Sequence, residues 1–146
     1  MNESWRSLIA LTAACTVAAT IFGFGAQVFS WRSVYGDLGR EELIQATRVF
    51  VYVALGVLLA FRGGWRGVLA AIAMATVATS VEWLLYPFSY AWATLEDPAG
   101  YADKFGGVKR PSYAAWGAIY DILGVGISAA LAQGLRTMAQ VDPRGL

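Results

Sequence analysis

Four long apolar segments dominate this chain and constrain its fold class. A helix of about 20 residues, rising 1.5 Å per residue, crosses about 30 Å of hydrocarbon. The sequence is 58% hydrophobic and 14% charged, and the apolar residues fall into continuous blocks rather than amphipathic stripes. We therefore predict an all-α integral membrane protein, a single domain formed by an antiparallel bundle of four transmembrane helices. The predicted helices cover approximately residues 8–29, 43–61, 68–86 and 112–135.

The connections between the segments differ in length. Gly63 and Gly64 mark a tight turn, which makes the second and third helices antiparallel neighbours. Pro87 is expected to end the third helix, and Pro111 to be the first residue of the fourth. The long connection 88–110 interleaves aromatic with charged residues. Because aromatic residues are rare in disordered chains, we predict that this loop is an ordered lid.

Composition excludes several kinds of chemistry. The net charge is +1, which gives no reason to expect nucleic acid as a partner. The sequence has no histidine, and Cys15 is its single cysteine. An intrachain disulfide, a Cys-x-x-Cys redox pair, a His-ligated haem and a His-based zinc or copper site are therefore excluded. We expect no metal and no cofactor, so any chemistry must come from carboxylates, arginine, aromatic side chains and backbone.

Each predicted helix carries one polar stripe, recognised by polar or small residues at spacings of three and four. Because consecutive helices alternate in direction, one polar residue from each stripe falls in the same leaflet. An unpaired charge in hydrocarbon costs about 2.5 to 17 kcal/mol, so the three ionisable residues among these are expected to meet rather than face lipid separately. The four residues are Gln27, Arg48, Glu82 and Asp121.

This cluster is the candidate site. Two carboxylates facing one guanidinium leave one negative charge uncompensated, so we expect one acid to carry a proton at neutral pH. That acid could then donate a proton while the other acts as base. The predicted catalytic residues are Arg48, Glu82 and Asp121, and the predicted substrate-binding residues are Gln27, Tyr52, Trp83, Tyr86, Trp116 and Tyr120.

Several functions fit such a cluster. The first is a small membrane enzyme that isomerises or cyclises a lipophilic small molecule, or opens its epoxide. The second is a proton-coupled transporter or channel, which could be a homodimer. The third is an accessory subunit of a membrane complex. A buried ion pair can also serve only to fix helix register, with Trp83 and Trp116 as interface anchors. The surplus carboxylate and the long aromatic loop favour a functional site.

Membrane orientation is not specified by the sequence, because equal numbers of basic residues flank the two sides. We expect the protein to reside in the lipid bilayer of a bacterial cytoplasmic membrane. One side holds Arg6, Arg62, Arg66, Arg136 and Arg144, and the other holds Arg32, Arg40, Lys104, Lys109 and Arg110.

Overall fold

A computed structural model describes residues 3–34, 38–94 and 111–140, and within these ranges the chain forms four helices and no strand. Each helix contains a segment long and apolar enough to cross a membrane. The predicted all-α, membrane-spanning fold class is therefore confirmed. The helices are α1 (Glu3–Val34), α2 (Leu38–Gly63), α3 (Trp65–Thr94) and α5 (Pro111–Gln140). Their candidate spans are Ser4–Ser30, Leu43–Gly63, Trp65–Tyr86 and Gly117–Gln140.

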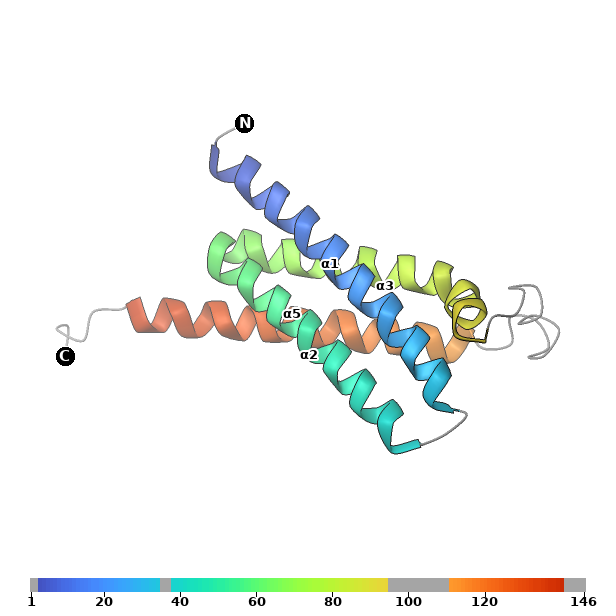
Figure 1. Cartoon of the computed structure of the whole chain (residues 1–146). Helices are drawn as coiled ribbons and strands as arrows, with labels where there is room; N and C mark the ends of the chain where they lie inside the picture. The colour runs from blue at the N-terminus through green and yellow to red at the C-terminus, as the bar shows by residue number, and fades with distance from the viewer. Residues whose placement is uncertain (1–2, 35–37, 95–110, 141–146) are drawn as a thin grey trace.

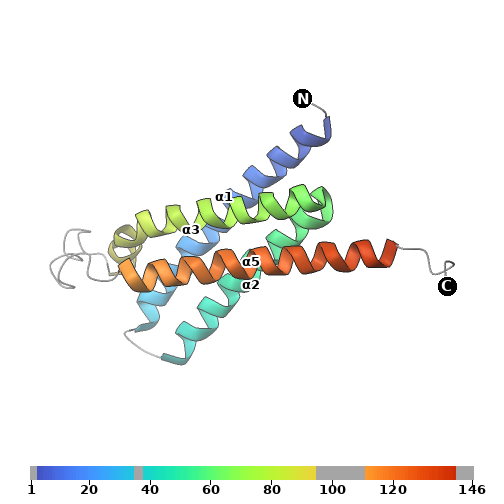
Figure 2. The ribbon, with the colours of Figure 1, turned by 180° about the vertical axis from the view of Figure 1, so that it is seen from behind.

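The helices form two crossed layers (Figure 1). Helices α1 and α2 run antiparallel in one layer, and α3 and α5 run antiparallel in the other, as the reverse view also shows (Figure 2). Helices α2 and α3 each contact the other three described helices, whereas α1 and α5 do not contact each other. The start of α1, the α2–α3 turn and the end of α5 all lie at the same end of the bundle (Figure 1).

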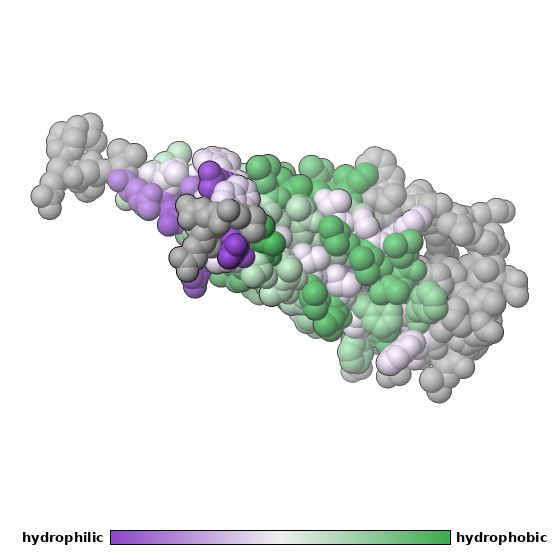
Figure 3. Space-filling model, turned by 90° about the horizontal axis from the view of Figure 1, so that it is seen from above, coloured by the Kyte–Doolittle hydropathy of each residue, from purple (hydrophilic) through white to green (hydrophobic). Residues whose placement is uncertain are grey.

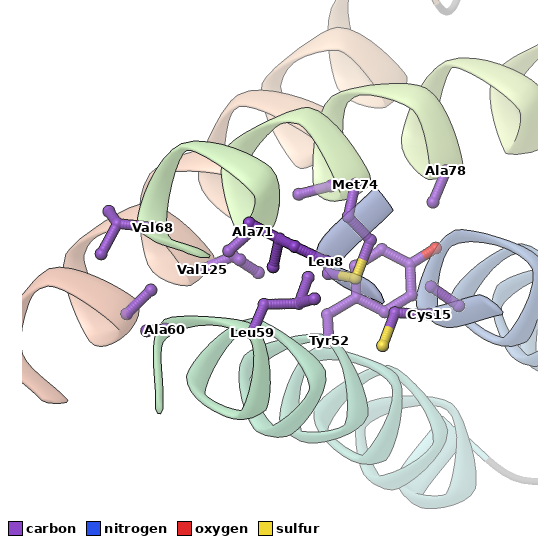
Figure 4. Packing of buried hydrophobic residues seen from close by; sticks show 13 residues of the cluster. Leu8, Cys15, Tyr52, Leu59, Ala60, Val68, Ala71, Met74, Ala78 and Val125 are labelled. Carbon is purple, nitrogen blue, oxygen red and sulfur yellow. The ribbon is translucent and has the colours of Figure 1, made fainter. Parts of the chain in front are cut away.

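Alanines of α3 pack among larger side chains in the buried core of the bundle (Figure 4). Ala71, Ala75 and Ala78 on α3 have no exposed surface. Gly67 lies so close to the backbone carbonyl of Leu59 that a Cβ atom there would overlap it. Since lipid tails are as apolar as the helices, association in a membrane depends on such close packing. The alanine-rich part of α3 therefore holds the two layers together.

The turn between α2 and α3 depends on one glycine. Gly64 has φ of 60°, a left-handed conformation that side chains other than glycine rarely adopt. Its N–H donates to the carbonyl of Ala60 at 2.8 Å, which closes the end of α2. Arg136 of α5 donates to the neighbouring carbonyl of Phe61. The tight turn predicted at Gly63–Gly64 is thus observed, and α5 provides a further hydrogen bond to it.

The prediction that Pro87 ends the third helix is wrong, because α3 continues to Thr94. The last turns of α3 run in a different direction from the rest (Figures 1 and 2). Proline removes one backbone hydrogen bond and crowds the preceding turn, and a helix can accommodate this by bending. Ser89 donates its hydroxyl to the carbonyl of Tyr86 at 2.7 Å, a local polar contact beside the bend. Residues 88–94 of the predicted lid are therefore helical, and 95–110 lie outside the described residues.

Other helices also extend beyond their predicted ends at residues 29 and 135. Helix α1 continues to Val34, and α5 continues to Gln140. The length of an apolar run is set by the thickness of the hydrocarbon layer. A helix can continue past it, because its backbone hydrogen bonds can also form in the head-group region. The predicted start of the fourth helix at Pro111 is confirmed.

The outer surface of the bundle is apolar over its middle (Figure 3). Large side chains such as Ile21 and Phe50 are 67% and 70% exposed. Hydrophilic residues gather near the end that holds the start of α1 and the end of α5 (Figure 3). Such a surface suits a bundle whose middle faces lipid tails and whose end reaches the head groups.

We predict that Ser4 and Thr137 face the same side of the membrane. Cysteine introduced at either position, in a Cys15→Ala background, should react with a membrane-impermeant maleimide added to that side only. Both residues belong to described helices at the same end of the bundle, and Thr137 is exposed. Labelling of the two cysteines from opposite sides of sealed vesicles would contradict the antiparallel arrangement.

Candidate functional site

Arg48 of α2 lies between two carboxylates that come from the other layer. Its Nη1 donates to Oε2 of Glu82 on α3 at 2.8 Å, and its Nη2 donates to Oδ2 of Asp121 on α5. Glu82 is only 2% exposed and Asp121 only 5%. The three ionisable residues predicted from the polar stripes therefore lie together in the structure, and both acids are buried.

Gln27 connects α1, the remaining described helix, to the cluster. Its side-chain Nε2 donates to the same Oε2 of Glu82 at 3.3 Å. Within the candidate spans, Gln27, Arg48 and Glu82 each lie a few residues from one end, about 5 to 8 Å inside at 1.5 Å per residue. The cluster is thus set inside the hydrocarbon, near one face of the membrane.

Tyr52 lies one turn from Arg48 on the same face of α2. It has no exposed surface, and it extends from α2 into the core (Figure 4). The Cζ atom of Arg48 lies 5.6 Å from the centre of its ring, within the range of a cation–π interaction. Tyr52 therefore supports the guanidinium from the core side.

Four side chains of the cluster each keep a buried polar atom that has no hydrogen-bond partner among the described residues. Buried polar atoms in folded proteins are nearly always paired, because an unpaired one costs about 1 to 3 kcal/mol. Several such atoms around a single ion-pair network mark a place where a ligand or water could bind. The atoms are Oε1 of Gln27, Nε of Arg48, the hydroxyl of Tyr52 and Oε1 of Glu82.

Gly23 makes room for the Glu82 carboxylate. A Cβ atom at this position of α1 would overlap the Glu82 carboxylate, Oε1 included. Gly23 lies one turn before Gln27 on the polar stripe of α1, so the sequence placed it on the correct face. Sequence reasoning did not give it a role at the site, because a glycine in a transmembrane helix more often serves close helix packing.

The structure does not bring every predicted substrate-binding residue into the cluster. Trp83 is 47% exposed and Tyr120 is 69% exposed, so both lie on the outer surface of the bundle. Neighbouring residues in a helix point about 100° apart, which turns each ring away from the acid beside it in the sequence. Tyr86 is half-buried, one turn beyond Glu82. The side chain of Trp116 lies outside the described residues.

The guanidinium of Arg48 supplies a positive charge to both carboxylates. Among the described residues, no three His, Cys, Asp or Glu side chains gather closely enough to hold a metal. The cluster contains one guanidinium and two carboxyl groups, so it is neutral only when one carboxyl group is protonated. A proton on either carboxylate would therefore balance the charge of the cluster.

We predict that Gly23→Ala destabilises the protein by about 1 to 3 kcal/mol, the usual cost of overpacking a filled site. Gly25→Ala is the matched control, because a Cβ atom there meets nothing within 4 Å. The control should be neutral or gain up to about 1 kcal/mol from helix propensity. Thermal unfolding in detergent measures both variants. In a Glu82→Ala background the effect of Gly23→Ala should largely vanish, and an undiminished effect would show that the carboxylate is not the obstacle.

The cluster connects all four described helices through polar side chains. Its ion pairs join three helices, a fourth helix adds an amide, and several buried polar atoms remain available for a ligand. Comparisons of the chain with known protein families, with characterised proteins and with solved structures found no match.

Proposed function

We propose that this chain is a small membrane enzyme that uses Glu82 and Asp121 as an acid and base pair on a lipophilic small molecule. The observation that carries the proposal is the set of buried unpartnered atoms around the ion pairs. A cluster built only to fix helix register would be expected to pair its polar atoms internally, because each one left unpaired weakens the bundle. A site that receives a substrate instead keeps groups free to bind it.

The chemistry follows from the charge balance. With one proton shared between two carboxylates and one guanidinium, one acid can donate while the other accepts. In an isomerisation, the protonated carboxyl gives its proton to the first carbon of a substrate double bond, and the carboxylate removes a proton from the third carbon, next to the cationic second one, so that the double bond moves by one position. The substrate keeps its composition, and the proton held by the site passes from one acid to the other. Cyclisation and epoxide opening would begin with proton donation from the same acid, to a double bond in the first case and to the epoxide oxygen in the second.

The substrate class follows from the location of the site. Glu82 lies within a candidate membrane span, and the middle of the outer surface is apolar. A molecule that reaches the cluster from the bilayer must itself partition into hydrocarbon. The hydroxyl of Tyr52 and Oε1 of Gln27 could bind a hydroxyl or carbonyl group on it. We place the protein in a bacterial cytoplasmic membrane, whose hydrocarbon thickness of about 30 Å suits these helices.

Proton-coupled transport is the second candidate, and one observation favours it. Gln27 and Arg48 belong to the α1–α2 layer, whereas both acids belong to the α3–α5 layer. Neutralising an acid would weaken the attraction between the layers at this end of the bundle. Rocking of one helix pair against another is how many transporters expose a central site to alternate sides.

We predict that Glu82→Gln and Asp121→Asn each lower the rate by about 10² to 10⁴, because an amide keeps the volume of the acid but cannot exchange its proton. The assay is deuterium incorporation from D₂O into a panel of lipophilic alkenes and ketones, together with loss of lipophilic epoxides, read by mass spectrometry with protein in liposomes. Gln133→Leu is the control, since Gln133 is a buried polar residue on α5 outside the cluster. It should retain activity.

Stability measurements separate this role from a structural one. A purely structural cluster predicts that the amide variants, and Arg48→Met with them, lose about 3 to 5 kcal/mol, the scale for breaking a buried pair. Unfolding in detergent tests this. Unchanged deuterium incorporation in both amide variants would refute the acid–base role. A different pair of results would favour the transporter. The wild type would then show a pH-driven proton flux across liposomes but no deuterium incorporation, and the amide variants would lose that flux.

A further inference from the structure

A cavity lies at the opposite end of the membrane spans from the ion-pair cluster. It has a volume of about 540 Å³ and opens between the start of α1, the end of α2 and the start of α3. Its apolar wall is formed by Leu8, Leu11 and Leu58, and two arginines, Arg62 and Arg66, also line it. The cavity therefore combines a hydrocarbon surface with positive charge.

The charge of this cavity is not neutralised locally. The described residues that line it include no acid, and neither arginine forms a salt bridge with a described residue. The guanidinium of Arg66 lies over the ring of Trp5, with Cζ 4.9 Å from its centre. Stacking on an aromatic face holds a guanidinium while leaving its N–H groups free for an anion.

The depth of the cavity matches the head-group region of a bilayer. The residues that line it lie at the start of the span Ser4–Ser30, the end of Leu43–Gly63 and the start of Trp65–Tyr86. Lipid phosphates lie at this level, directly outside the hydrocarbon. The leucines lie further along the spans and so extend the cavity toward the acyl chains.

We propose that this cavity binds an anionic phospholipid, with its phosphate on Arg62 and Arg66 and the first part of an acyl chain against the leucines. Planar guanidinium groups suit phosphate oxygens because they can donate two hydrogen bonds at once. Basic pockets between transmembrane helices are a known way to hold anionic head groups. Free phosphate shares the same ionic chemistry, but it would leave the apolar wall without a partner.

The test measures lipid binding to the purified protein in detergent by native mass spectrometry. Each arginine near the membrane surface contributes about fivefold to the binding of an anionic lipid, so Arg62→Gln combined with Arg66→Gln should weaken phosphatidylglycerol binding about 30-fold. Phosphatidylcholine should bind the wild type no better than it binds this double variant. Arg6→Gln is the matched control, an exposed arginine of α1 that does not line the cavity.

A second variant tests the cavity without removing charge. Ser7 is exposed and lines the cavity, so Ser7→Trp should fill part of it and weaken phosphatidylglycerol binding while both arginines remain. Equal phosphatidylglycerol binding by the wild type, the double arginine variant and Ser7→Trp would overturn the proposal. Inorganic phosphate that competes fully at the same concentration as the lipid would also overturn it, because the site would then recognise the anion alone.

Discussion

The structure depends on the need to pair charge inside hydrocarbon. Arg48 lies within the membrane span, and Glu82 and Asp121 pair with its charge there. Each contact fixes the rotation and the axial position of a helix, so the three residues set the register of α2, α3 and α5 together. The small residues of α3 then allow the layers to come close enough for these contacts.

The size of this constraint explains why the centre of the site could be predicted. An unpaired charge costs several kcal/mol in lipid, more than the differences that decide between side-chain conformations. The polar stripes and alternating helix directions were therefore sufficient to place Arg48 beside its two acids. Finer features depend on smaller energies. The outward direction of Trp83 and the continuation of α3 past Pro87 depend on local rotation and bending, which the residue pattern does not encode.

The ion pairs alone would not distinguish a functional site from a structural one. Replacing a buried ion pair with apolar residues is often neutral or stabilising, so such a pair is a weak reason for a protein to be stable. Here a single guanidinium faces two acids, and Glu82 and Gln27 each retain a buried acceptor with no partner among the described residues. The ion pairs account for the register of the helices, whereas these unpartnered acceptors add nothing to it.

The crossed layers also divide the interior into two compartments. Between the cluster and the α2–α3 turn, the core is closed by Leu59, Met74 and Val125 together with fully buried alanines. Hydrocarbon packed at this density excludes water, so it is an insulator between the two ends. In the proposed enzyme, a proton taken up at Glu82 would return to the face from which it came, and the gradient across the membrane would be kept. In a transporter, this packing would have to open before the proton could cross.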